Sequence, residues 1–196
     1  MIFNLFRRRE ADAAEALYRE IVARARQPAF YRDLAVPDTA EGRFEMILLH
    51  LALVFHRLKS EDKQTARFGQ GVLDAFFRDM DRSLREMGIG DLSVPKKMKK
   101  LSYAYNGRSL AYDRGLDDGD PHLLAAAVRR NALGVEAGKE TPAEIDAAER
   151  IGAYMLKTRD LLAAEPVALV IAGAFQTADL VDAASPSPKE TDHDSD

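Results

Sequence analysis

Four lysines and one tyrosine supply the chemistry that this sequence offers most clearly. They lie in the segment VPKKMKKLSYAYNGR, which we predict to be helical, as Lys96, Lys97, Lys99, Lys100 and Tyr103. At 100° per residue all but Lys97 share one sector of that helix, and Lys97 lies on its flank. Ammonium groups gathered beside an aromatic ring favour contact with acidic protein surfaces or lipid headgroups. The alternative is an ordinary solvated helix face that serves solubility.

Arg108 lies farther along the same predicted helix, at the border of its apolar side. That side consists of Val94, Met98, Leu101, Tyr105, Tyr112 and Leu116. An arginine at this border either meets a partner together with the lysines or ties the apolar side to a neighbouring helix. We therefore predict a partner-binding surface made of Lys96, Lys97, Lys99, Lys100, Tyr103 and Arg108, and keep a structural role for Arg108 as the alternative.

Motifs for catalysis, nucleotide binding and metal binding are absent from the sequence. It has no cysteine, and it contains none of the patterns GxxxxGKS/T, GxGxxG, GxSxG and HExxH. The one Glu-x-x-His pair, Glu190 with His193, lies in the C-terminal tail. His50 and His56 are six residues apart, so they lie on roughly opposite sides of a helix and cannot share a metal. We expect no enzymatic activity, no metal and no cofactor.

A ligand enclosed in a helical core is the alternative function, because haem, quinone or lipid needs little beyond an apolar pocket and one or two polar groups. A deep pocket beside His50 or His56 would favour this function, and a filled core would favour a protein that works through its surface. We expect each histidine to be a hydrogen-bonded core or boundary residue.

Charge is balanced over most of the chain. The 28 basic and 32 acidic residues give a net charge of -4, which argues against general nucleic-acid binding. The tail from Asp182 holds enough excess acid to account for all of this net charge. The lysine-rich stripe is therefore a local feature of a neutral folded part.

The predicted elements are all helices. The segment from Phe44 to Leu58 is apolar nearly all round, which places it at the centre of a bundle, and it is shorter than the roughly 20 residues that cross a bilayer. Start signals lie at Glu10, Asp38 with Glu41, Ser93, Asp120 and Thr141 with Glu144, and an end signal lies at Gly88. Gly69 and Gly71 indicate a kink or loop before the helix from Val72. Residues 167–175 form a C-terminal helix or a docked extended segment.

The fold class that follows is all-α, a single compact multi-helix bundle with a disordered acidic C-terminal tail. We divide the chain into a mobile apolar and basic N-terminus (1–9), a helical domain (10–181) and the tail (182–196). The start MIFNLFRRR has the apolar-then-basic order opposite to that of a signal peptide, so we expect no export signal. It is either a frayed end or a weak membrane-surface anchor.

Several stretches of the chain resemble the ubiquinol-cytochrome c chaperone family of alphaproteobacteria, which is related to mitochondrial assembly factors for respiratory complex III. They are DAFFRDMDRSLREMGIGDLSVPKKMKKL, YNGR, AYDRGL and LAAAVRRNALG. The resemblance covers about residues 30 to 160, and GDLSVPKKMKK is its most specific part. One departure is Asn106 after Tyr105, where the family is expected to have an aromatic pair.

This resemblance implies a non-enzymatic helical chaperone. Its expected partner is newly made cytochrome b or its assembly intermediate, with room for a second assembly factor and for peripheral contact with the inner membrane, and no nucleic acid. The expected location is the cytoplasm or the cytoplasmic face of that membrane. A general membrane-surface adaptor that uses the first nine residues and the lysine stripe is a third alternative.

Overall fold

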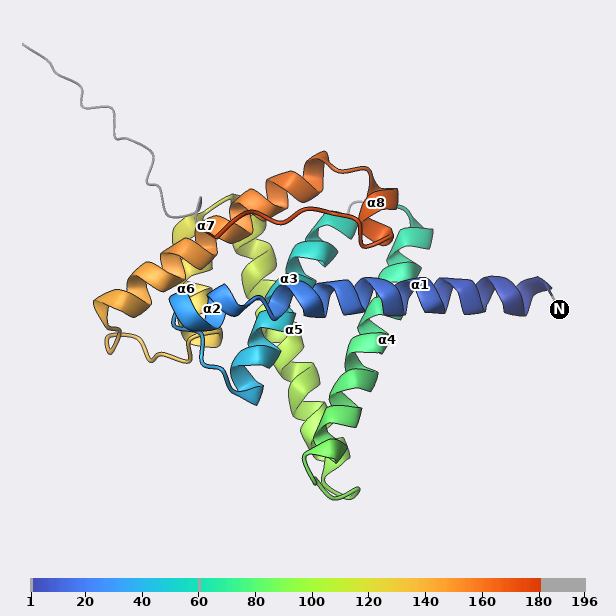
Figure 1. The fold of residues 1–196 in the computed structure, drawn as a ribbon, viewed down its shortest axis with the longest axis horizontal. Coiled ribbons are helices and arrows are strands. Elements are labelled where there is room, and N and C mark those ends of the chain that lie inside the picture. The colour runs from blue at the N-terminus through green and yellow to red at the C-terminus, as the bar shows by residue number, and fades with distance from the viewer. Residues whose placement is uncertain (1, 60, 181–196) are drawn as a thin grey trace, which may run out of the picture.

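The protein is an all-α bundle, as predicted. The computed structural model describes residues 2–59 and 61–180, and no strand occurs in this part of the chain (Figure 1). The helices are α1 (Ile2–Ala25), α2 (Pro28–Asp33), α3 (Ala40–Leu58), α4 (Lys63–Glu86), α5 (Val94–Asp118), α6 (Pro121–Asn131), α7 (Pro142–Ala164) and α8 (Val167–Ile171). The expected tail at 182–196 lies outside the described residues. None of the helices described is both long and apolar enough to span a membrane.

Helix α3 is the centre of the bundle. It contacts α1, α4, α5 and α7, and its buried residues include Leu49, Leu51 and Leu53, which are almost fully excluded from water. The central position predicted for the segment from Phe44 to Leu58 is therefore confirmed. Because α3 is covered on several sides, it could not keep a polar face without burying unpaired groups.

Helices α4 and α5 form a hairpin whose tip projects away from the bundle (Figure 1). Gly88 ends α4 with a φ of 79°, a left-handed conformation that a side chain would disfavour. The two helices share an aromatic cluster, in which the ring centroid of Phe77 lies 5.0 Å from that of Phe76 and 6.1 Å from that of Tyr105. Beyond this cluster, toward the tip, each helix has mainly the other to pack against.

Caps at two later helices confirm the sequence signals. The Asp120 carboxylate accepts hydrogen bonds from the first amides of α6, and Thr141 with Glu144 forms the predicted capping box of α7. Helix α6 then packs closely against both α5 and α7, since Gly115 and Gly152 leave room for it. A Cβ at Gly115 would lie only 2.7 Å from Cδ2 of Leu124.

One predicted helix cap was wrong by a residue, and one predicted capping hydrogen bond is absent. Thr39, not Asp38, caps α3 by accepting from the Gly42 amide, and Asp38 pairs instead with Arg43. Ser93 is the N-cap residue of α5, as predicted, but its side chain forms no capping hydrogen bond. Asp38 fails as a cap because its carboxylate pairs with Arg43, and Ser93 has a helical backbone, with φ -95° and ψ -23°, instead of the extended one that side-chain caps usually have.

The expected break at Gly69 and Gly71 was also wrong, because α4 begins at Lys63 and runs through both glycines. The Asp62 carboxylate caps α4, and a Cβ at Gly71 would lie 3.2 Å from Cβ of Ala14. Gly71 thus lets α1 and α4 cross at short distance. Helix α1 itself begins at Ile2, eight residues before the predicted start at Glu10.

The C-terminal segment combines the two forms predicted for residues 167–175. After the short helix α8, an extended strap (residues 172–180) runs back along α7 (Figure 1). Phe175 is buried, and the guanidinium carbon of Arg24 lies 4.0 Å from its ring centroid. Arg24 also donates to the Phe175 carbonyl at 2.7 Å, so the strap is fixed to α1.

Candidate partner-binding surface

The predicted lysines lie on the exposed side of α5, near the tip of the hairpin. Lys96, Lys97, Lys99 and Lys100 are all exposed, and none forms an ion pair within residues 2–59 and 61–180. Helix α5 positions them because its apolar side, which includes the buried Val94 and Tyr112, packs on α4 and the bundle. The four ammonium groups therefore form a positively charged surface that no ion pair with a described residue neutralises.

Tyr103 extends this surface toward the middle of α5. Its side chain is 65% exposed, and Lys99 Nζ lies 5.8 Å from the ring centroid, within range of a cation–π contact. Such an exposed aromatic ring offers apolar contact area at the edge of a charged patch.

Leu110 belongs to the same face and was missed from the sequence. It is 74% exposed, and a Cβ at Gly107, one turn before it, would meet no atom within 4 Å. Helical periodicity in the sequence could have identified it, because Leu110 falls in the same 100° sector of the helix as Lys99 and Tyr103. The face thus combines lysines at its N-terminal end with Tyr103, a bare backbone position at Gly107, and Leu110.

Arg108 pairs with Glu45 of α3, the kind of contact that its structural alternative predicts, while its part in partner binding stays a prediction. Its Nε lies 3.0 Å from both carboxylate oxygens of Glu45 on α3, and its Nη2 lies 2.7 Å from Oε1. Glu45 is only 7% exposed. Burial raises the pKa of the Glu45 carboxyl, and the Arg108 guanidinium opposes this shift by favouring the carboxylate.

The core beside His50 is filled. Nδ1 of His50 lies 2.8 Å from the Met46 carbonyl, to which it donates, and Nε2 lies 2.9 Å from the Tyr154 hydroxyl, from which it accepts. The hollow next to it, lined by Leu53 and Phe175 among others, leaves no room for a water molecule. Burial lowers the pKa of His50 to about 4, so the ring is neutral. Neither ring nitrogen is available to a haem iron.

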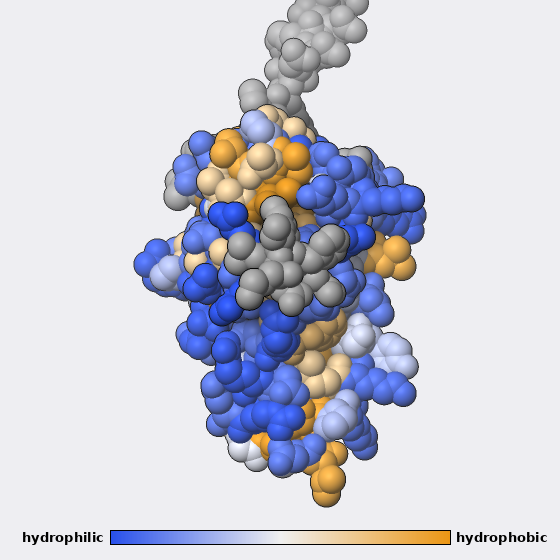
Figure 2. Space-filling model, turned by 90° about the vertical axis from the view of Figure 1, so that its right-hand side faces the viewer, coloured by the Kyte–Doolittle hydropathy of each residue, from blue (hydrophilic) through white to orange (hydrophobic). Residues whose placement is uncertain are grey.

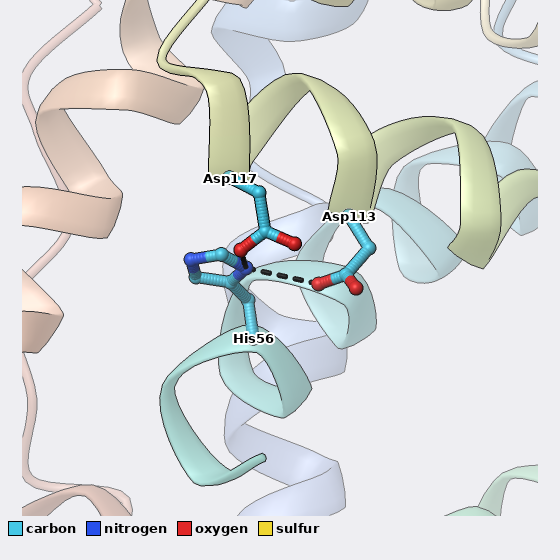
Figure 3. Close-up of side chains that lie close together, drawn as sticks. All are labelled: His56, Asp113 and Asp117. Carbon is cyan, nitrogen blue, oxygen red and sulfur yellow. Dashed lines mark hydrogen bonds and ion pairs between the residues drawn. The ribbon is translucent and has the colours of Figure 1, made fainter. Parts of the chain in front are cut away.

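His56 lies in a polar cluster that joins α3 to α5 (Figure 3). Its Nδ1 is 2.9 Å from Oδ1 of Asp113 and 3.9 Å from Oδ1 of Asp117. These donor atoms are close enough together to surround a metal ion. Lys59 Nζ, however, lies 2.8 Å from Asp113 and 2.7 Å from Asp117, and its ammonium supplies the positive charge that the two carboxylates require. The cluster acts as an ion-pair network that holds the ends of two helices.

Comparison with known proteins decides the family. The family described as ubiquinol-cytochrome C chaperone matches residues 32–178. The chain belongs to this family. The match spans α3 to α8 with the whole hairpin, and it confirms the resemblance expected from the sequence. A crystal structure of the Cbp3 homolog from Brucella abortus is 42% identical, with a TM-score of 0.77 over 92% of this chain and 98% of that one.

Relatives of this chain also include eukaryotic proteins. The ubiquinol-cytochrome-c reductase complex assembly factor 1 of Xenopus laevis is 26% identical over 121 residues, 62% of this chain and 60% of that protein. The mitochondrial protein CBP3 of Saccharomyces cerevisiae is 32% identical over 110 residues, 54% of this chain and 32% of that protein. The chain therefore spans less than two thirds of the length of these relatives.

Proposed function

We propose that this protein is a non-catalytic chaperone that binds newly made cytochrome b and promotes assembly of the ubiquinol-cytochrome c reductase complex. The names of its relatives, which include complex assembly factors, support a role in assembly. The observation that carries the proposal is the exposed face of α5, where four lysines without an ion pair to any described residue lie beside Tyr103 and Leu110. Such a face suits a partner that is both apolar and acidic.

The mechanism is stoichiometric binding. A cytochrome b intermediate exposes apolar helices until its haem groups and partner subunits are in place, so a chaperone must cover such surface and later release it. Exposed Tyr103 and Leu110 provide apolar contact, and Lys96, Lys99 and Lys100 draw in acidic or lipid groups. Charged contacts at the rim of an interface raise the association rate more than the affinity. A client held in this way is bound quickly and released easily.

The alternative of a ligand held in the core is disfavoured by the packing at His50, where both ring nitrogens are engaged and no space remains. We assign residues 10–181, the helical domain defined from the sequence, as the chaperone domain. This domain acts in the cytoplasm or at the cytoplasmic face of the inner membrane. A second assembly factor is a further proposed partner.

The test is a crosslinking pull-down from membranes of the source organism, with the wild-type chain and the variant Lys99→Glu/Lys100→Glu. We expect the wild type to recover cytochrome b and the variant to recover at least about tenfold less, because two repulsive charges replace two attractive ones. Arg19→Glu/Lys139→Glu makes the same charge change at exposed positions on other parts of the surface, and we expect it to behave as wild type.

Circular dichroism must show that all variants are folded. Equal recovery by the wild type and both variants would move the binding surface away from α5. Failure of the wild type to recover cytochrome b would reject the proposed client.

A further inference from the structure

Gly107 is a glycine that the packing of this chain does not require. It lies in the interior of α5, where glycine makes a helix less stable than alanine does. Gly115 on the same helix has a reason, since Leu124 packs against it, but a Cβ at Gly107 would meet no described atom within 4 Å. The backbone at Gly107 is helical, so a left-handed conformation does not call for glycine either. A bare stretch of helix backbone therefore faces solvent.

Two large side chains flank this bare position on the exposed face of α5. Tyr103 precedes Gly107 by four residues and Leu110 follows it by three, so all three lie on one side of the helix. Tyr103 and Leu110 are both well over half exposed, and they project on either side of a depression at Gly107. A ridge of side chains on another helix fits such a depression, because the side chains at a crossing set the distance between two packed helices.

The charge on this face indicates the sign of the partner. From Leu92 to Tyr112 the chain has four lysines and one arginine and no acidic residue. The arginine, Arg108, is paired with Glu45, and the acids that follow at the end of α5 form ion pairs of their own. The lysines come two to three turns of helix before Gly107, so one end of a helix that crosses there lies near them. Acidic residues at that end complement the lysines.

We propose that an α-helix of the client packs across α5 at Gly107. The client helix has a small residue at the crossing point, apolar residues against Tyr103 and Leu110, and acidic residues toward the lysines. A side chain at position 107 would hold the two helices apart, so glycine lowers the stability of the free chaperone and allows closer contact in the complex. This inference rests on the proposed function and specifies which kind of client segment is bound.

The tip of the hairpin is a separate apolar surface. Figure 2 shows hydrophobic atoms at the lower end of the molecule, where Figure 1 places the turn between α4 and α5. Leu92 in this turn is 98% exposed, and Met87 at the end of α4 is 56% exposed. These side chains lie on a turn and form no helical ridge, so they do not offer the depression found at Gly107. Leu92→Ser removes apolar surface from the tip and serves as the comparison variant.

The first experiment compares stability with client binding in Gly107→Ala and Gly107→Leu. We expect both variants to melt up to about 4 °C above the wild type, because alanine and leucine favour a helix more than glycine does. In the crosslinking pull-down, we expect Gly107→Leu to recover at least about tenfold less cytochrome b, and Gly107→Ala to lie between it and the wild type. Ala23→Leu adds bulk at an exposed position of α1 and should recover as much as the wild type.

Gly107→Leu also enlarges the apolar surface, which distinguishes close helix packing from simple apolar contact. Recovery by Gly107→Leu equal to or above that of the wild type would overturn the crossing at Gly107 and leave the proposed function in place. Loss of recovery by Leu92→Ser, with full recovery by Gly107→Leu, would move the contact to the tip. Failure of the wild type to recover cytochrome b would reject the proposed function, and this inference with it.

The second experiment uses the absence of cysteine from the chain. In the full-length variant Asn106→Cys, a single thiol next to Gly107 carries a photoreactive benzophenone maleimide. We expect irradiation in membranes to join it to cytochrome b, and the further change Gly107→Leu to lower the yield about tenfold. The same label on Ala23→Cys should give no such product. Equal yields from the two labelled positions, or a yield that Gly107→Leu leaves unchanged, would contradict the crossing.

Discussion

The guanidinium of Arg108 is held by the carboxylate of Glu45, which water barely reaches. Arg108→Met would leave Glu45 buried without its partner, and we expect the free energy of unfolding to fall by about 2 kcal/mol. The cost is below that of a fully buried pair because the Arg108 side chain is 30% exposed. Chemical denaturation measures it.

The double variant Glu45→Met/Arg108→Met serves as the control, since it leaves no charge buried and should regain most of the lost stability. If it also recovers cytochrome b like the wild type, Arg108 is structural and not a contact residue. An unchanged stability in Arg108→Met would show that the ion pair contributes nothing measurable.

His50 makes the stability of the fold depend on pH. Its pKa is lowered to about 4 in the folded protein, whereas the unfolded chain binds a proton near pH 6.5. The unfolded state therefore takes up the proton first as the pH falls. We expect the stability that His50 contributes to be complete above pH 6.5 and to decrease by up to about 1.4 kcal/mol per pH unit down to pH 4.

Denaturation with urea at pH 7, 6 and 5 measures this dependence. The variant His50→Gln is less stable but lacks the titrating ring, so its stability should change less over the same range. Equal slopes in the two proteins would place the pH dependence elsewhere.

Among the helices, the contact of α5 with α6 depends on one missing side chain. Gly115→Ala places a Cβ 2.7 Å from Cδ2 and 2.8 Å from Cγ of Leu124, which is fully buried and cannot move aside. We expect a loss of about 1 to 3 kcal/mol in the free energy of unfolding. Gly107→Ala on the same helix meets open space and should stabilise the protein by up to about 1 kcal/mol, because alanine favours the helix. Thermal unfolding of the two variants distinguishes them, and a stabilised Gly115→Ala would contradict the packing described.

The same scale explains which elements could be predicted. The caps at Asp120 and Thr141 and the end at Gly88 were predicted correctly because the atoms they satisfy lie within a few residues along the chain. Gly71 was misjudged because its reason lies in Ala14 of another helix. The lysine face followed from helical periodicity alone, whereas the partner of Arg108 sits 63 residues away and required the fold.

At the scale of the whole molecule, the lysine face of α5 lies on the projecting hairpin (Figure 1). The core around α3 is filled and held by the His56 cluster and the Glu45–Arg108 pair. A rigid body of this kind can present the lysine face to a client without changing shape.

The strap that closes over α7 has a consequence for how the chain is made. Arg24 in α1 donates to Phe175, 151 residues later, and Leu180 is buried beyond it. Contacts at such separation form late, because the long loop between them must close first. During synthesis, α1 can pack on α3 and α4 early, but its contact with the strap cannot form until nearly all of the sequence has left the ribosome. The completed bundle is therefore a product of release from the ribosome, and a truncated chain would display the apolar side of α1 that the strap normally shares.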